Sequence, residues 1–257
     1  MNRIITLTQK RVIKPEAVHP VALEEDGRIV LADCGDPELA YSLMDEMRSE
    51  GLAPERITHI IITHHDLDHM GGLSQFRDAI PDVIIMATAV QAEYICGHSR
   101  WLRLQHEDAQ YLSAPPERRI PSGRVRAAQY MSFLPARVDC ILEEGAELPF
   151  CGGCKVIPTP WHMPGHISLY LSKHKTLITG DALNTFGGCI GLNSAVDLCP
   201  EMTAAGLPVL AELDVETVCG YHGGELHLAP GQFRTQIMEL YDRIKLQSAE
   251  KGFLNIL

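Results

Sequence analysis

The sequence of 257 residues contains no run of about 18 apolar residues, the minimum that a helix needs to cross a bilayer. Its first residues, MNRIITLTQKRVIKPEAVH, also lack the apolar segment of a secretory signal peptide. These absences argue against a membrane protein and predict a cytoplasmic location. Eight cysteines without a secretion signal are then expected to be reduced thiols rather than a disulfide framework.

Positive charge is also scarce, with 22 Lys and Arg against 33 Asp and Glu and a net charge of −11. Nucleic acids and anionic membranes favour basic surfaces, so neither is an expected partner. The chain has no G-x-S-x-G motif, low-complexity segment or solenoid repeat. A small-molecule substrate is the remaining expectation, and the sequence leaves a homo-oligomer open.

What is present is a succession of short apolar runs bounded by turn residues. Helical spacing is expected over 37–51, from 73 to about 76, over 200–213 and from about 230 onward. Strands are expected at 3–8, 17–26, 27–33, 56–63, 82–88, 139–145, 151–160, 168–173, 175–181 and 216–224. Two β-rich halves, each followed by helices, predict one α/β domain over 1–257, with a sheet-on-sheet core and helices on both outer faces.

Residues 96–135 break this rhythm with several prolines and no clear periodicity. Such an insertion is often a lid or binding segment. It carries six arginines, which form either a solvated surface or a cationic rim for a substrate carboxylate or phosphate. They are Arg100, Arg103, Arg118, Arg119, Arg124 and Arg126.

The densest polar cluster is THHDLDHMGG at 63–72, directly after an apolar strand. His64, Asp66 and Asp68 alternate, which places their side chains on one side of an extended segment. His69 follows Asp68, so this adjacent pair can diverge towards a second point. The spacing favours two neighbouring metal ions. Three further candidates lie beside glycines at strand ends, and they are His166, Asp181 and His222.

Together these motifs resemble the metallo-β-lactamase-fold hydrolase superfamily. The elements THHDLDHMGG, TPWHMPGHISL, LITGD and YHGG follow that family's order, and LADCG, with Asp33, resembles its early element near the site floor. The resemblance spans essentially the whole chain. It implies a four-layer αβ/βα sandwich of the metallo-β-lactamase type.

The resemblance also implies two metal positions. The first would be held by His64, Asp66 and His166, and the second by Asp68, His69 and His222, with Asp181 bridging. A metal-bound hydroxide would attack an ester, lactone, thioester or phosphodiester. Asp68 would in addition orient that nucleophile and accept a proton, as the catalytic residue.

One position departs from the common pattern, because Asp66 stands where many members have histidine. Two divalent ions, three aspartates and a hydroxide sum to zero charge, whereas histidine at position 66 would leave one positive charge. Oxygen ligands also shift preference from zinc towards harder ions. We therefore expect two divalent ions, zinc foremost with iron or manganese as alternatives, and expect Asp66→His to fold and to retain zinc better.

Other polar residues near the motifs have plainer interpretations. His65 should point away from the metals, and Tyr221 should point away by strand alternation. His162 is either a residue of the surrounding layer or a substrate contact. The segment from Cys151 to Cys154 is either a redox or zinc C-x-x-C, or an ordinary hairpin turn around two glycines.

Two further function classes compete with hydrolysis. The flavodiiron oxygen reductases share the implied fold and also carry a carboxylate at the second motif position, but theirs is Glu and they carry an attached flavodoxin domain. A non-catalytic member of the fold is the other alternative, and it would be expected to have lost ligands. Every ligand position here is filled by a group that can bind a metal, which favours the hydrolase.

Overall fold

The first of two six-stranded β-sheets is formed by the N-terminal half of the chain. The computed structural model describes residues 2–11, 16–113 and 134–254. The strand order is β1-β4-β5-β6-β7-β8, antiparallel at β1, β4 and β5 and parallel from β5 to β8. The strands span Arg3–Thr6, Val21–Glu25, Arg28–Ala32, Ile57–Ile61, Ile84–Thr88 and Cys140–Leu142.

The second sheet is formed by the C-terminal half, in the order β14-β13-β12-β11-β10-β9. Only the β12–β13 pair is parallel in this sheet. From β9 to β14 the strands span Glu147–Leu148, Cys154–Pro158, Ile167–Leu171, Thr176–Ile178, Thr217–Gly220 and Gly224–His227. A separate pair of short strands, β2 (Gln9–Lys10) and β3 (Ala17–Val18), precedes β4.

The two sheets pack face to face because each central strand carries apolar side chains on both faces. In β5, Val30 faces the other sheet while Leu31 faces outward, and in β6 Ile61 and Ile60 divide in the same way. The second sheet supplies Val156, Ile167, Leu169, Leu171 and Ile178 to the layer between the sheets. Strands buried on both faces are expected to be continuously apolar, as 60–62 are.

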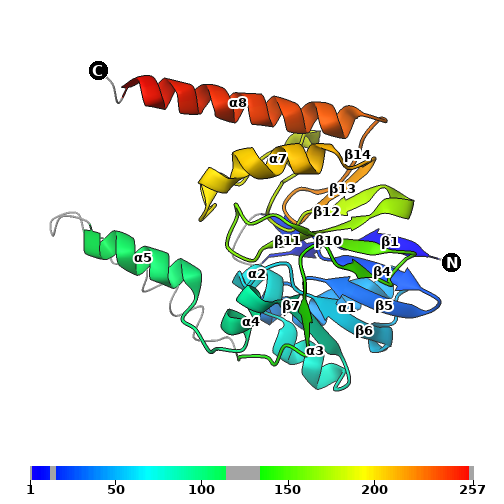
Figure 1. Ribbon diagram of the computed structural model, residues 1–257. Helices are drawn as coiled ribbons and strands as arrows, with labels where there is room; N and C mark the ends of the chain where they lie inside the picture. The colour runs from blue at the N-terminus through cyan, green and yellow to red at the C-terminus, as the bar shows by residue number, and fades with distance from the viewer. Residues whose placement is uncertain (1, 12–15, 114–133, 255–257) are drawn as a thin grey trace.

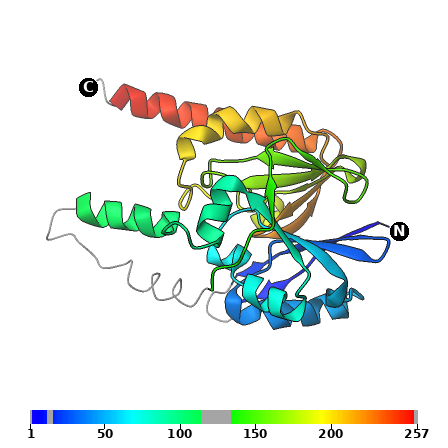
Figure 2. The ribbon, with the colours of Figure 1, turned by 60° about the horizontal axis from the view of Figure 1, so that its bottom comes forward.

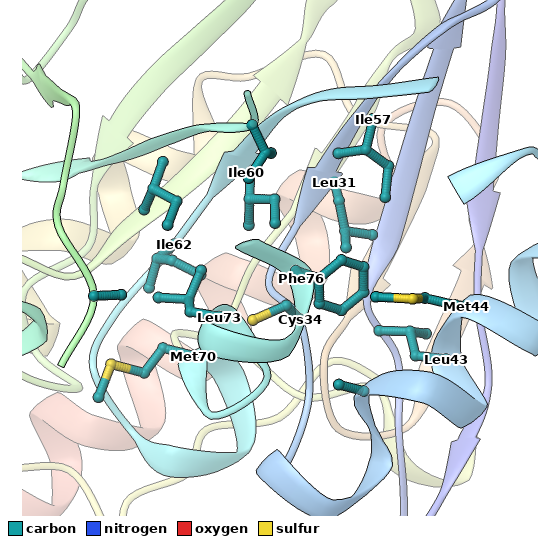
Figure 3. Close-up of a cluster of buried hydrophobic side chains, with 14 of the residues drawn as sticks. Leu31, Cys34, Leu43, Met44, Ile57, Ile60, Ile62, Met70, Leu73 and Phe76 are labelled. Carbon is teal, nitrogen blue, oxygen red and sulfur yellow. The ribbon is translucent and has the colours of Figure 1, made fainter. Parts of the chain in front are cut away.

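Helices cover the two outer faces (Figure 1). Helices α1 (Ala40–Ser49) and α3 (Leu73–Ala79) cover the first sheet, where Leu43 and Phe76 belong to the same buried cluster as Ile60 (Figure 3). Helices α7 (Thr203–Ala211) and α8 (Gln232–Leu254) cover the second sheet through residues such as Leu207 and Ile237. The predicted four-layer αβ/βα sandwich is confirmed.

Several local predictions need correction. The expected strand at 17–26 divides into β3 and β4 at Pro20, which has no N–H to donate to a ladder. The short elements α2 (Leu67–Met70), α4 (Ala89–Ile95), β9 and β14 were not predicted. The helix expected over 37–51 begins later, because Pro37–Leu39 form a 3₁₀ turn before α1.

Helix α5 (Leu102–Ser113) lies within the predicted insertion at 96–135. It starts beside the sandwich and extends away from it in both ribbon views (Figures 1 and 2). Arg118, Arg119, Arg124 and Arg126 lie outside the described residues. Among the described residues, no helix combines the length and the apolar character needed to span a bilayer.

Candidate metal centre

The chemistry-bearing motifs meet at one edge of the sandwich, where strands of both sheets end. Asp33 follows β5 and the segment 64–69 follows β6 in the first sheet. Asp181 follows β12 and His222 follows β13 in the second sheet, and the loop between β10 and β11 carries two further histidines. Carboxyl ends of parallel strands are the usual place for a site in α/β proteins.

Two groups of donor side chains converge there. The first contains His64, Asp66, His162 and Asp181, and the second contains Asp68, His69 and His222. Within each group the donor atoms lie within 4.8 Å of one another. Asp181 also approaches the second group, because its Oδ1 is 3.2 Å from His69 Nε2 and 3.4 Å from His222 Nε2. Six of the seven predicted ligands are therefore brought together.

His166 is the predicted ligand that the structure does not bring into either group. Its Nδ1 is 2.8 Å from the Thr159 hydroxyl, and its Nε2 accepts the backbone N–H of Asp181 at 3.1 Å. Both ring nitrogens are thus used within the protein, and the ring supports the backbone at Asp181.

His162 takes the place expected for His166. Its Nε2 lies 3.6 Å from Asp66 Oδ2 and 3.5 Å from Asp181 Oδ2. Its Nδ1 is 2.8 Å from Asp197 Oδ1, and a carboxylate in that position orients the ring towards the site. The sequence favoured His166 because it follows a glycine, but both histidines belong to the same motif, HMPGH.

Buried polar atoms without partners occur in both groups and indicate what the site could bind. His69 Nε2 and Asp181 Oδ1 are buried and make no hydrogen bond among the described residues, and the same holds for His64 Nε2. Buried polar atoms are normally satisfied, so such atoms call for a ligand. Imidazole nitrogens and carboxylate oxygens are the donors of divalent zinc, iron and manganese, and the residues of the second group fit such an ion.

Asp33 fixes the orientation of His69. Its Oδ2 lies 2.8 Å from His69 Nδ1, and its oxygens accept from the backbone N–H and hydroxyl of Thr63, both at 2.8 Å. With Nδ1 held in this way, Nε2 faces the site. Burial lowers the pKa of His69, but the carboxylates of Asp181 and Asp33 outweigh it and hold this pKa well above its usual range.

The pKa values of the other donors follow from burial and charge. Burial and the neighbouring His69 hold the pKa of His64 well below its usual range, so this imidazole is neutral and able to bind a metal. Burial raises the pKa of Asp181, but His222 and His69 lower it well below its usual range. That carboxylate is therefore ionised at neutral pH.

Asp66 is paired with an arginine that the sequence placed on a solvated surface or a rim. The Arg103 Nε lies 2.7 Å from Asp66 Oδ1 and 2.6 Å from Oδ2, and Arg103 Nη2 also donates to Oδ2. Burial raises the pKa of Asp66, yet the guanidinium outweighs it and holds this pKa well below its usual range. Nothing in the sequence distinguishes Arg103 from its neighbour Arg100, which forms an exposed pair with Asp108.

Asp68 has an arginine partner as well. Arg11 Nη1 donates to Asp68 Oδ2 at 3.0 Å, while Arg11 Nε lies 2.8 Å from Asp36 Oδ2. The prediction that Tyr221 points away from the site was wrong. Its ring stacks on His69 with centroids 3.7 Å apart, and its hydroxyl donates to the backbone oxygen of Asp68.

Two plainer predictions are also resolved. His65 points away from both ligand groups. Its Nδ1 lies 2.6 Å from Gln91 Oε1, and its ring stacks on that of Tyr94 with centroids 4.3 Å apart. The segment 151–154 is the turn of the β9–β10 hairpin, with positive φ angles at 151–153. Cys151 and Cys154 are free thiols, and burial raises their pKa values to about 11 and about 12.

A sandwich of this type, with a His and Asp cluster at the strand ends of both sheets, defines a class of metalloprotein. The metallo-beta-lactamase superfamily model matches residues 13–222, and the chain belongs to that superfamily. The superfamily predicted from the motifs is therefore confirmed. Its members bind divalent metals, usually zinc.

Curated relatives include several hydrolases. The "Probable metallo-hydrolase YflN" of Bacillus subtilis is 24% identical over 236 residues, which cover 86% of this chain and 84% of that protein. A hydroxyacylglutathione hydrolase of Stenotrophomonas maltophilia is 25% identical over 166 residues, which cover 64% of this chain but only 45% of that enzyme. This chain spans less than half of the second relative.

Solved structures share the fold at low identity. A metallo-beta-lactamase family protein from Thermus thermophilus superposes with a TM-score of 0.72 at 21% identity, covering 99% of this chain and 82% of that one. A metallo-beta-lactamase from Cronobacter sakazakii gives a TM-score of 0.66 at 17% identity, over 97% and 95% of the two chains. At these identities the likeness establishes the fold alone.

Proposed function

We propose that the chain is a metal-dependent hydrolase that uses water to cleave the acyl bond of a small carboxylic ester, lactone or thioester. Phosphodiesters are the alternative substrate class. The observation that carries this proposal is the convergence of buried, unpartnered donor atoms from both sheets at one site. The hydroxyacylglutathione hydrolase among the relatives supports a thioester as the first substrate class to test.

The ion belongs with Asp68, His69, Asp181 and His222 in this proposal. A divalent ion bound there supplies a coordinated water whose pKa is depressed towards neutrality, and a Lewis acid for the substrate oxygen. The chain's own contribution is orientation and charge, because the Asp33 carboxylate fixes the His69 ring and the Tyr221 ring packs against it.

Asp68 is the group that we assign to orienting the attacking water and accepting its proton. Burial raises the pKa of this carboxyl, whereas His69 and Arg11 more than offset that and lower it. The ionised form needed by a general base is thereby maintained. Arg11 holds one of its oxygens, Oδ2, at 3.0 Å, which restricts the carboxylate to one orientation.

A panel of acyl-glutathione, lactone, aryl-ester and phosphodiester probes tests the proposal, with metal-free protein reconstituted with zinc, manganese or iron. We expect metal-dependent hydrolysis of at least one probe. Asp68→Asn should reduce turnover by about 100-fold or more, the range for removal of a general base. Asp45→Asn, an exposed aspartate on α1 paired with Arg48, should leave turnover unchanged.

Two outcomes would contradict the hydrolase. One is the absence of hydrolysis of every probe with each metal, and the other is full activity in Asp68→Asn. Iron in the purified protein with oxygen consumption and no hydrolysis would favour the flavodiiron-like redox alternative. A tightly bound metal with neither activity would favour a non-catalytic member of the fold.

A further inference from the structure

Arg103 contacts two members of the first ligand group, Asp66 and His162. It lies in the first turn of α5 with 8% of its surface exposed. Besides its contacts with both oxygens of Asp66, its Nη2 lies 2.9 Å from His162 Nε2 and its Nη1 donates to the Val196 backbone oxygen at 2.7 Å. The guanidinium therefore lies between two of the four residues that would hold the first ion.

These contacts use the lone pairs that a metal would need. Zinc binds carboxylate oxygen and imidazole nitrogen at about 2.0 to 2.2 Å through lone pairs that point at the ion. Here both Asp66 oxygens accept from Arg103, and His162 Nε2 faces the same guanidinium. A divalent ion at this point would also lie against a fixed positive charge that cannot be deprotonated in a protein.

The second group differs in this respect. Arg11 contacts a single oxygen of Asp68, whereas Arg103 covers both oxygens of Asp66. The facing atoms His69 Nε2 and Asp181 Oδ1 make no hydrogen bond among the described residues. The donors of the second group and Asp181 are thus open to an ion. In the first group Arg103 already engages Asp66 and His162, which leaves His64 Nε2 as the group's own unpartnered nitrogen among the described residues.

We propose that the chain binds one divalent ion, at Asp68, His69, Asp181 and His222, and that the Arg103 guanidinium is the permanent cation of the first position. The inference rests on the proposed metal-dependent function and specifies its metal count. It replaces the expectation of two ions and gives Asp66 a different role, as the counter-charge that holds Arg103.

This assignment explains why position 66 carries a carboxylate. An aspartate presents two acceptor oxygens and a negative charge to the planar fork of an arginine. A neutral histidine offers one acceptor nitrogen and no charge. A buried guanidinium opposite histidine would be left without compensation, so aspartate at 66 and arginine at 103 form a matched pair.

Metal stoichiometry tests this proposal without reference to turnover. Metal-free protein is titrated with cobalt(II), followed by its visible absorption, and with zinc, followed by native mass spectrometry. We expect a single end point at one ion per wild-type chain and an end point at two ions in Arg103→Ala. Arg100→Ala removes a neighbouring arginine whose pair with Asp108 is exposed, and it should bind one ion like the wild type.

Two ions bound to the wild type, or one ion bound to a correctly folded Arg103→Ala, would overturn the proposal. Circular dichroism checks the fold of each variant. If Arg103→Ala does not fold, Arg103→Met keeps the apolar stem and removes the charge, and the same two end points apply to it. Failure of the hydrolase panel would leave these counts unchanged, so the two proposals fail separately.

Discussion

The pairing of Asp66 with Arg103 is the residue-scale feature that most changes the interpretation of the sequence. Both side chains are buried, at 7% and 8% exposure. Breaking a buried ion pair by removing one partner leaves an uncompensated charge and typically costs about 3 to 5 kcal/mol. The contribution of this pair is therefore to hold the start of α5 against the site.

We predict that Asp66→Asn lowers the free energy of unfolding of the metal-free protein by about 3 to 5 kcal/mol, because the amide keeps the shape but not the charge. Urea denaturation measures this loss. Asp108→Asn breaks the exposed pair with Arg100 and should cost no more than about 1 kcal/mol. Equal losses of unfolding free energy in the two variants would show that the buried Asp66–Arg103 pair stabilises the fold no more than the exposed pair does.

His65 gives a residue-scale prediction on pH. Burial lowers the pKa of this histidine to about 4, whereas an unfolded histidine titrates near about 6.5. Between these values the unfolded chain binds more protons than the folded one, so stability is full above about pH 6.5 and falls as the pH drops towards 4. The loss across this window amounts to roughly 3 kcal/mol.

Unfolding of the metal-free protein by urea at a series of pH values measures this effect. His65→Gln cannot titrate, so its free energy of unfolding should vary less with pH between 4 and 6.5 than that of the wild type. Parallel curves for the two proteins would remove His65 as a source of acid lability.

At the scale of elements, the turn after β12 places Asp181. Gly180 has a φ of +50°, and a Cβ at this position would lie 2.7 Å from His166 Nε2 and 2.9 Å from the Thr63 hydroxyl. Neither neighbour is free to move, since both rest in buried hydrogen bonds. Only glycine lets the chain pass this close to the ligand loops.

Gly180→Ala should therefore weaken zinc binding by at least about tenfold and lower stability by more than the roughly 1 to 2 kcal/mol expected for positive φ alone. Gly51→Ala is the matched control. It has a φ of +76° with nothing within 4 Å of an added Cβ, so it should show the strain without the loss of zinc. Competition with a chromogenic chelator gives both affinities, and equal values would contradict the packing argument.

The strand-end motifs could be predicted from sequence because strands buried on both faces leave a clear apolar signature, as at 60–62. The cluster at 64–69 and Asp181 could be predicted because each stands just after such an apolar run. The choice of His162 over His166 could not, since it depends on which ring the hydroxyl of Thr159 engages. Whether the Arg103 side chain points at Asp66 depends on where α5 starts, and no local sequence pattern determines that start.

At the scale of the whole molecule, the proposed ion would join the two sheets. Asp68 and His69 follow a strand of the first sheet, and Asp181 and His222 follow strands of the second. A ligand that binds only the folded chain stabilises it by about 4 kcal/mol at a concentration 1,000 times its Kd. Removal of the ion with a chelator should then lower Tm by roughly 10 °C. An unchanged Tm in differential scanning calorimetry would contradict a bridging ion.

The layered architecture could be predicted from the order of β-rich and helical segments, and the superfamily from four motifs taken together. The proposed metal count could not, because the proposal depends on a contact between residues 37 positions apart in sequence. Sequence motifs identify which residues could be ligands, whereas the structure determines whether their lone pairs are engaged.

Hydrolysis, in the function proposed for this chain, depends on an ion held by Asp68, His69, Asp181 and His222. The most direct measurement is the rate of hydrolysis of a substrate found in the panel, as zinc is added stepwise to metal-free protein. We predict no turnover without metal and a rise that levels at one equivalent per chain. Turnover that persists after complete metal removal would contradict this dependence.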